Sequence, residues 1–591
     1  MLQVEHLDHV KYIGAGAFQN CKRLAENQQG VLDLSQFTLI PEDAFSGCIN
    51  VKEVHLSDKA TYIGKSAFSG CKQLTSITLP DSLTTLSSLA FYDCSMLQHV
   101  SYPESLQHIH YTSFLNTPWM NALPVENGVK YMGNIALCYD KTSSVADASL
   151  SFREGTAVIA DEFFGSMEYR QWKNATKLDF PASLRHIGDK AFTGNNLVTL
   201  TLPEKLESIG EEAFYNSAQL AKLTLSEGLE YIGEYAFGNC PNLTIINYNA
   251  VRAEGKAAFS GCSSLEKVNV GNKVQLLPDR VFNNCQALTL VKCEERAGII
   301  PLTIGEEAFS DCRQLARVSL PDGTIRIEDG AFANCSKLQS FALPSSIIYI
   351  GKNAFSKCES LTEVDVPEGI ETIEDGTFSD CSSLQRANIP ESVNSIGERA
   401  FSNCILTEIA LPEHLTSIGT SAFSGCSLLE QIYLPSSLTT LGQSAFSGCT
   451  NLLEANLPGS LTEAGTGIFA DCINLGKLTL GHKQPIEYQN FFYMTSDMVI
   501  SFYGDYNTVT VPKSKGYFYE NVSLYVPFGS KPDYEAAAYW QDFQNIVELP
   551  RDGEAEITVM DITNLIERYL NGNGDVTVAD ITDLIGKYLG Q

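Results

Sequence analysis

Apolar residues recur along this chain in a repeated unit, and the segment at 429–449, LEQIYLPSSLTTLGQSAFSGC, shows the unit clearly. Leu429, Ile432 and Leu434 predict a short strand on which these three side chains face inward. Pro435 follows them and ends the strand, because proline has no backbone N–H to donate to a ladder. The first half of the unit therefore predicts one rung of a sheet.

The second half of the unit predicts another inward-facing segment and then a turn. Leu438 and Leu441 form that second segment, and Gly442 is expected to permit a tight bend. The phrase AFSGC at 445–449 follows, and its alanine, phenylalanine and cysteine are expected to fill the interior from a short helical or irregular turn.

The phenylalanine of this phrase marks the register of every unit, and most successive markers are 22 or 23 residues apart. The markers are Phe18, Phe45, Phe68, Phe91, Phe114, Phe164, Phe192, Phe214, Phe237, Phe259, Phe282, Phe309, Phe332, Phe355, Phe378, Phe401, Phe423, Phe446 and Phe469. A fixed period of this length is typical of a solenoid, in which each coil buries its apolar face against its neighbours. We expect such a solenoid over residues 1–480, with a parallel β ladder, short helical or irregular turns and a right-handed coil.

The step from Phe114 to Phe164 is longer than the others and contains an insertion near 115–160. We expect a degenerate coil with a protruding pair of strands there. A dedicated ligand loop is the alternative, because long loops often carry function.

Seventeen cysteines are present, and fifteen of them lie three residues after a marker phenylalanine. They form one column with a member in fifteen of the nineteen coils, represented by Cys48, Cys71, Cys312, Cys335, Cys358, Cys426 and Cys449. Side chains stacked about 4.8 Å apart along a ladder point the same way, whereas a disulfide needs converging Cβ atoms. The column is therefore predicted to consist of buried, reduced, structural thiols.

The whole unit, L-x-x-I-x-L-P-x-x-L-x-x-I-G-x-x-A-F-x-x-C, resembles the BspA-like leucine-rich repeats of bacterial surface proteins. The resemblance covers about residues 1 to 480 and all nineteen markers. It implies an exported, surface-attached protein that acts in adhesion or recognition, with an extracellular or host protein or a glycan as its partner.

Composition and charge narrow the classes of partner. The formal net charge is −30 at pH 7, so the mean field repels nucleic acid and anionic lipid surfaces. There is no run of 18 apolar residues, and direct insertion into a membrane is not expected. The start, MLQVEHLDHV, lacks the features of a signal peptide but already reads as the inside of a repeat, so we expect a leader to have been trimmed. A cytoplasmic location, compatible with free thiols, is the alternative to the cell surface.

The sequence contains no recognisable catalytic constellation. It has no H-E-x-x-H, G-x-S-x-G, P-loop or dinucleotide motif, and its nine histidines are scattered. His108 and His110 share a face if the chain is extended there, which is more typical of a solvated strand than of a metal site. No cofactor and no enzymatic activity are predicted.

The outward-facing residues of the strands remain as candidates for ligand binding. Arginine and tyrosine are frequent in binding hot spots, which singles out Arg317, Arg386 and Tyr433, with Glu408 beside them. One outward stripe carries Lys222, Lys267, Arg317, Glu363, Arg386, Glu408, Gln431, Glu454 and Lys477, so charge is expected to alternate along it without a field of a single sign. A solvated sheet face without a ligand is the simpler interpretation.

Two further segments follow the repeats. Residues 481–548 read as a β-rich cap, with a short helix expected at Tyr534 to Trp540 to close the apolar end of the solenoid. Residues 549–591 contain an internal duplication that resembles a dockerin-like helical pair, which implies docking to a partner.

In that pair, calcium-loop positions are occupied by Asn571, Asn573, Asp575, Thr577 and Asp580. Tyr569 replaces the first ligand, so any calcium binding is expected to be weak, and a metal-free helical pair is the alternative. The predicted function is thus non-enzymatic surface binding through the solenoid, with assembly through residues 549–591 as the second hypothesis.

Overall fold

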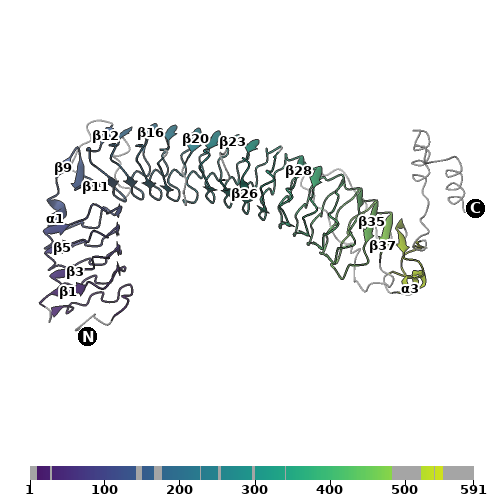
Figure 1. Ribbon diagram of the computed structural model, residues 1–591, viewed down its shortest axis with the longest axis horizontal. Helices are drawn as coiled ribbons and strands as arrows, with labels where there is room; N and C mark the ends of the chain where they lie inside the picture. The colour runs from purple at the N-terminus through teal and green to yellow at the C-terminus, as the bar shows by residue number, and fades with distance from the viewer. Residues whose placement is uncertain are drawn as a thin grey trace, which may run out of the picture. The chain divides into compact units, whose positions relative to one another are not determined.

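The computed structural model describes residues 10–26, 29–140, 149–165, 176–226, 228–249, 255–295, 300–339, 341–481, 521–537 and 540–549. The chain divides into two compact units, residues 1–370 and 371–591, and each is considered by itself. Both are built from stacked coils, as the period of the apolar residues predicted (Figure 1). Most coils contribute one strand to each of two parallel ladders, which we call the first and the second ladder.

The first ladder contains the strands of the Ile-x-Leu segment, and its inward residues pair in register from coil to coil. Ile77 is opposite Val100, and Leu200 is opposite Leu223. In the first unit its strands are β1 (Val31–Leu34), β3 (Glu53–Leu56), β5 (Ser76–Thr78), β7 (His99–Ser101), β12 (Ser149–Ser151), β14 (Lys177–Asp179), β16 (Thr199–Thr201), β18 (Lys222–Thr224), β20 (Ile245–Tyr248), β21 (Lys267–Val270), β23 (Leu290–Cys293), β25 (Arg317–Ser319) and β28 (Glu363–Asp365). In the second unit they are β30 (Arg386–Asn388), β33 (Gln431–Ile432), β35 (Glu454–Leu457), β37 (Lys477–Leu480), β38 (Ser523–Val526) and β39 (Asn545–Glu548).

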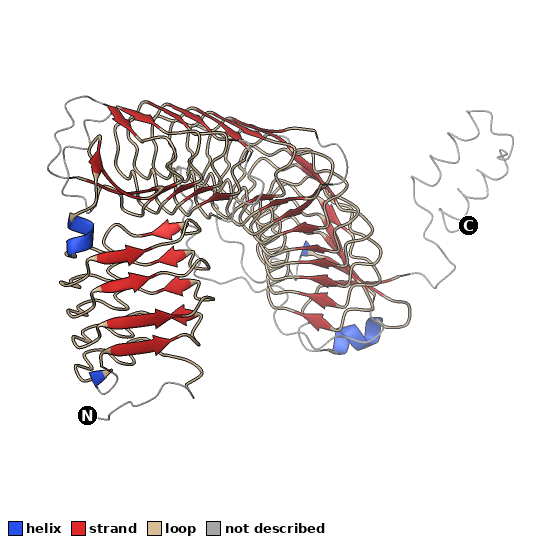
Figure 2. Cartoon of the chain, turned by 60° about the vertical axis from the view of Figure 1, so that its left-hand side comes forward, coloured by secondary structure: helices blue, strands red, loops and turns tan. Residues whose placement is uncertain are grey.

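The second ladder contains shorter strands, and all of them except β36 end in one buried aliphatic residue. In the first unit these are β2 (Leu39–Ile40), β4 (Tyr62–Ile63), β6 (Thr85–Leu86), β8 (His108–Ile109), β13 (Val158–Ile159), β15 (His186–Ile187), β17 (Ser208–Ile209), β19 (Tyr231–Ile232), β22 (Leu276–Leu277), β24 (Leu302–Ile304), β26 (Thr324–Ile327) and β27 (Tyr349–Ile350). In the second unit they are β29 (Thr372–Ile373), β31 (Ser395–Ile396), β32 (Ser417–Ile418), β34 (Thr440–Leu441) and β36 (Glu463–Ala464). Figure 2 shows the strands of both ladders as rows of arrows across the coils.

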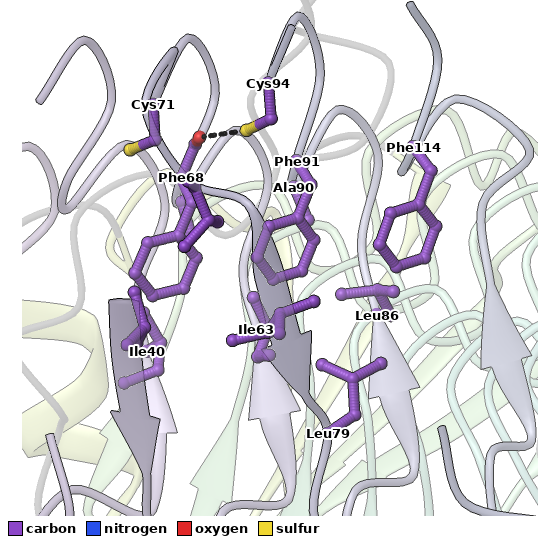
Figure 3. Close-up of a cluster of buried hydrophobic side chains, with 14 of the residues drawn as sticks. Ile40, Ile63, Phe68, Cys71, Leu79, Leu86, Ala90, Phe91, Cys94 and Phe114 are labelled. Carbon is purple, nitrogen blue, oxygen red and sulfur yellow. Dashed lines mark hydrogen bonds between the residues drawn. The ribbon is translucent and has the colours of Figure 1, made fainter. Parts of the chain in front are cut away.

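The marker phenylalanines stack face to face through the interior. Phe68 and Phe91 have ring centroids 5.3 Å apart with an interplanar angle of 8°, and the Phe91–Phe114 pair is similar at 5.2 Å and 3°. Ile40, Ile63 and Leu86 of the second ladder lie against these rings (Figure 3). The backbone holds the same spacing, because the Phe68 N–H donates to the Ala90 carbonyl of the next coil at 2.8 Å.

The column of rings is interrupted at the predicted marker Phe164. The preceding residue, Phe163, is fully buried, whereas Phe164 is only partly buried and its ring lies at 62° to that of Phe192. This coil has phenylalanine in place of the usual alanine, so two rings compete for one interior position. Its neighbour is also unusual, because Tyr139 of the insertion donates its N–H to the Phe163 carbonyl.

The insertion contains α1 (Pro118–Asn121), β9 (Val125–Glu126), β10 (Val129–Met132) and β11 (Ile135–Tyr139). β9 and β10 form an antiparallel pair, and a strand pair was predicted here. β11 pairs with β10 and also joins the second ladder in parallel with β13. Trp119 of α1 lies 4.7 Å from Phe114 and covers the last ring of the first stack. Whether the insertion also binds a ligand stays a prediction.

The representative coil at 429–449 shows where the sequence was interpreted correctly and where it was not. Leu429, Ile432 and Leu434 are all buried, as predicted, but the strand ends at Ile432 rather than at Pro435. The Leu434 N–H donates to the Asn456 side-chain oxygen at 2.6 Å, and the Asn456 amide donates back to the Leu434 carbonyl at 2.9 Å. A side chain of the next coil therefore replaces the ladder bonds here.

The structure also gives a different reason for glycine at position 442 from the one predicted. It has no positive φ, so a tight bend does not require glycine here. A Cβ at this position would instead overlap the backbone of Gly419 and Thr420 in the preceding coil. The glycine therefore permits close approach of two coils.

The last described part of the second unit continues the first ladder. β38 pairs in parallel with β37, and β39 pairs in parallel with β38. The helix α3 spans Lys531–Ala536, so it begins earlier than the predicted Tyr534 to Trp540 segment. Tyr534 is fully buried and its ring lies 5.6 Å from that of Trp540. That residues 481–548 act as a cap stays a proposal.

We predict that Gly442→Ala destabilises the second unit by about 1–3 kcal/mol, because the new methyl group meets backbone that cannot rotate away. Denaturant unfolding followed by circular dichroism measures this change. Glu374→Ala is the matched control, since the same position of another coil in this unit already accommodates a Cβ, and it should cost less than about 1 kcal/mol. Equal midpoints for Gly442→Ala and the unmodified chain would contradict the close-approach explanation.

Candidate functional site

The first ladder presents its outward side chains as a continuous face on each unit. On β5, β16, β18, β28 and β30 the central residue is buried and both flanking residues are exposed. The inward residues are occupied by coil stacking, so they are not accessible to a ligand. The outward residues are accessible, and the predicted binding residues lie among them or beside them.

Arg317 lies in the first unit, on β25, where its side chain is exposed. It is opposite Leu290 of β23, and Leu290 is in turn opposite Lys267 of β21. Across this part of the ladder the outward charges are all positive, because Lys292 also faces outward from β23. The predicted stripe has three cations in succession here, Lys222, Lys267 and Arg317, so the alternation of charge does not extend to this part of the ladder.

Arg386, Glu408 and Tyr433 lie in successive coils of the second unit. Arg386 is exposed on β30, whereas Glu408 is exposed in a coil that has no strand at this position. Tyr433 lies one residue beyond β33, is 63% exposed, and donates its hydroxyl to Gln431 at 3.2 Å. Arg386 and Glu408 occupy the same outward position of their coils and Tyr433 lies two residues further along its coil, so the three are spread over the face and are not gathered into a cavity.

The same face carries an aromatic residue that the sequence interpretation missed. Tyr525 of β38 is opposite Thr479 of β37, and the Lys477 ammonium lies 5.3 Å from its ring centroid. Lys477 also pairs with Glu454 at 3.3 Å. Tyr525 was missed because the marker phrase stops after the last complete repeat, although the strand itself continues the ladder.

A shallow hollow of about 370 Å³ lies on the second ladder of the first unit. Its lining includes Asp279 and Asp329, but these carboxylates serve the stacking of coils. Asp279 accepts the Glu306 N–H at 3.1 Å, and Asp329 accepts the Lys352 N–H at 2.8 Å. Both carboxylates are therefore engaged by backbone of the next coil.

The histidines do not form a metal site within the described residues, where no group of three or more His, Cys, Asp or Glu side chains is arranged to hold a metal. His108 belongs to β8, and His110 follows that strand. His110 contacts the Thr112 hydroxyl at 2.7 Å and Glu162 at 3.5 Å. The contact with His110 lowers the pKa of Glu162, while burial lowers the pKa of His186 on the neighbouring strand β15.

The cysteine column is a set of thiol hydrogen bonds between coils. The thiol of each of these cysteines donates to the carbonyl of the marker phenylalanine one coil earlier: Cys71 to Phe45 at 3.4 Å, Cys94 to Phe68 at 3.2 Å and Cys335 to Phe309 at 3.2 Å. The Cys94 bond is drawn in Figure 3. Cys48, Cys312, Cys358, Cys426 and Cys449 make the same contact. All seventeen cysteines lie among the described residues and none is in a disulfide.

Three described coils lack the cysteine, and each has a different donor at that position. Thr117 donates to the Phe114 carbonyl at 2.7 Å, Ser217 to that of Phe214 at 2.6 Å, and Asn195 to that of Phe192 at 2.8 Å. All three side chains are buried. These three side chains donate to the marker carbonyl of their own coil, whereas the cysteine thiols donate to the marker carbonyl of the preceding coil, so the position accepts a buried polar group with a different bonding partner.

Burial also makes the thiols hard to ionise. It raises the pKa of Cys48 and of Cys94 to about 12 and the pKa of Cys71 well above its ordinary value. A thiolate is the reactive form of cysteine, so these side chains are poor nucleophiles and poor metal ligands at neutral pH.

Two findings concern the remaining predictions. No helix within the described ranges is long and apolar enough to cross a membrane. Asn571, Asn573, Asp575, Thr577 and Asp580 lie outside the residues that the structure describes, so the weak calcium site and the dockerin-like pair stay predictions.

The comparisons with known proteins agree with the repeat. The model of the BspA type leucine rich repeat region (6 copies) matches residues 11–144, 162–289, 302–430 and 378–499. No curated protein is significantly similar to the chain.

Three solved structures illustrate the likeness of fold. A leucine-rich repeat protein from Bacteroides ovatus is 22% identical over 73% of this chain and 88% of its own, with a TM-score of 0.25. A leucine rich cell surface protein from Faecalibacterium prausnitzii is 21% identical over 60% and 94%, with a TM-score of 0.34. The pneumococcal vaccine antigen PcpA is 18% identical over 80% and 89%, with a TM-score of 0.28. At these identities and TM-scores the three structures add nothing to the family match.

We predict that the chain loses stability above about pH 9 partly through its thiols. In the unfolded chain a thiol ionises near its ordinary pKa of about 8.5, whereas in the fold it stays protonated to a much higher pH. The folded state therefore binds more protons in this window, and stability falls as pH rises. Denaturant midpoints at several pH values measure the slope, which should be shallower for Cys71→Ala/Cys94→Ala.

Alkylation by iodoacetamide at pH 8.5, read by mass spectrometry, checks the same prediction without a substitution. Cys71 and Cys94 should remain unmodified in the native chain and react after unfolding. Rapid native modification of both would contradict the raised pKa values.

Proposed function

Because the chain belongs to the BspA-type leucine-rich repeat family, we propose that it is a non-enzymatic binding protein of a bacterial cell surface that presents the outward face of its first ladder to a ligand. Proteins of this family are usually found at the cell surface. Leucine-rich repeat proteins generally bind protein partners, so an extracellular or host protein is the favoured ligand and a glycan is the second choice.

The observation that carries this proposal is the difference between the two sides of each strand of the first ladder. Inward residues such as Ile432 are buried between stacked coils, while outward residues such as Tyr433 and Arg386 are exposed to solvent. A long row of accessible side chains fixed at regular intervals suits a large, extended ligand. A small substrate would instead need a concave site that surrounds it.

An enzymatic function has less support. In the hollow on the second ladder, Asp279 and Asp329 accept backbone hydrogen bonds, and Glu306 and Glu328 pair with Arg280 and Arg326. Burial raises the pKa of the Cys48, Cys71 and Cys94 thiols, which are protonated at neutral pH. Neither set offers an unengaged acid, base or nucleophile.

A docking role for residues 549–591 is the second candidate function. It is motivated by the duplicated segments ITVMDITNLIERYL and VTVADITDLIGKYL, which resemble a dockerin-like pair. Under this hypothesis the solenoid is a spacer and the partner binds at the carboxyl end of the chain.

We expect Arg386→Ala/Tyr433→Ala to weaken binding to a protein ligand by about tenfold or more, because arginine and tyrosine contribute disproportionately to protein interfaces. Surface plasmon resonance against a panel of matrix glycoproteins and serum proteins measures this effect. Arg399→Ala is the control, since Arg399 lies outside the strands of the first ladder and pairs locally with Glu398. Unchanged binding in the double variant would remove these two residues from the site.

We expect binding to survive both deletion of residues 549–591 and chelation of calcium. This expectation follows from placing the ligand on the solenoid rather than on the terminal pair. The same panel, extended with candidate docking domains, measures the full chain and the truncated chain with and without a chelator. Loss of binding on truncation would transfer the function to the terminal segment, and loss on chelation as well would point to its calcium loops.

A further inference from the structure

The strands β20, β21, β23 and β25 of the first unit form one four-stranded parallel sheet. Their register places eight outward side chains in two rows. The first row is Ile245, Lys267, Leu290 and Arg317, and the second row is Asn247, Asn269, Lys292 and Ser319. These eight residues are called the cationic sheet face below.

The cationic sheet face carries three positive charges and no negative one. The charge of this face is opposite in sign to the net charge of the chain, which has 70 acidic residues and 40 lysines and arginines. Lys292 and Arg317 are exposed and Lys267 is partly exposed, and within the described ranges none of the three forms an ion pair. Lys222, exposed on β18 of the preceding coil, adds a fourth cation beside them.

Acidic residues flank this face without forming ion pairs with its cations in the described part of the chain. Glu266 precedes β21 and Glu294 follows β23, and both are exposed. Neither pairs with Lys267 or Lys292 among the described residues. The sheet in the second unit differs, because there Lys477 is paired with Glu454.

The cations are close enough for their fields to add. Lys267 and Arg317 lie two strands apart, at about 9.6 Å for an ideal ladder, which is no more than a Debye length at 0.1 M salt. Their ladder partners also hold them at fixed intervals. A flexible anionic chain that approaches this sheet therefore meets several charges at once.

Apolar and amide groups alternate with the cations. Ile245 is 50% exposed, and Leu290, between Lys267 and Arg317, is partly exposed. The Asn269 amide donates to the Asn247 side-chain oxygen at 2.7 Å, which fixes both amides on the face. A sulfated glycan offers charge to the cations but has no apolar side chain for Ile245 and Leu290.

We infer that the cationic sheet face binds an acidic polypeptide segment in which apolar side chains alternate with carboxylates. The carboxylates pair with Lys267, Lys292 and Arg317, and the apolar side chains cover Ile245 and Leu290. This inference rests on the proposed function, since it names the chemistry of one ligand of the first ladder.

Fluorescence anisotropy with a labelled peptide of repeated Glu-Leu-Glu-Thr, and with labelled heparin as a second probe, tests this inference on the full chain. Lys267→Glu/Lys292→Glu/Arg317→Glu should raise the dissociation constant for the peptide at least about tenfold. Ile245→Thr/Leu290→Thr should raise it about threefold or more at unchanged salt dependence. Circular dichroism and the unfolding midpoint establish that each variant is folded.

The control is Lys205→Glu/Lys273→Glu/Lys337→Glu, which changes the net charge equally at three exposed lysines outside the face. Its dissociation constant should change less than about twofold. Equal weakening by both triple variants would overturn the inference in favour of the mean field of the chain. Binding of heparin alone, or peptide binding indifferent to the Ile245 and Leu290 changes, would overturn the assignment to an acidic polypeptide.

The matrix-glycoprotein panel separates this inference from the proposed function. A chain that ignores the peptide but still binds a panel protein overturns the inference and leaves the proposed function standing. A chain that binds neither overturns both, whereas peptide binding lost in the face variant and kept in the control supports the inference.

Discussion

The contact between one coil and the next, repeated through each unit, is what the structure depends on. The marker phenylalanine donates its N–H to the following coil, its ring stacks on the neighbouring rings, and its carbonyl accepts from the cysteine of the following coil, as Phe68, Phe91 and Cys94 show. These three contacts fix the same coil spacing at one position. The two ladders then have little freedom in register, because sliding one coil by a residue against its neighbour would break all three contacts together.

Much of the stacked fold could be predicted from the sequence, because the regular period of the apolar residues shows which of them face inward. Leu429, Ile432 and Leu434 recur with fixed spacing, so their inward orientation follows from the pattern alone. What the pattern could not show are contacts that depend on the neighbouring coil. Asn456 completes the backbone bonds of Leu434, and Gly442 makes room for Thr420. Each of these partners lies about one repeat away, so no local rule of strands or turns identifies it.

The candidate site was harder to predict, because exposure is a weaker constraint than burial. Inward residues must match one another, whereas an outward residue such as Tyr433 can vary without any effect on the stack. The sequence identified which positions face outward, and the register of β20 to β25 then showed which of them share one sheet. The order of charge signs along the sequence is a poor guide to the field of a surface. The register also places uncharged residues, Ile245 and Leu290, in the same row as the cations.

The three coils that replace cysteine by Thr117, Asn195 or Ser217 have a practical consequence. They show that the stack tolerates a buried hydroxyl or amide at this position, although each of the three donates to its own marker carbonyl rather than to that of the preceding coil. A version of the chain with the column rewritten in serine and threonine, and with Cys138 and Cys293 also replaced, would then contain no thiol to react with thiol reagents. A single cysteine placed on the first ladder of such a chain would be the one attachment site for a dye, a spin label or a crosslinker.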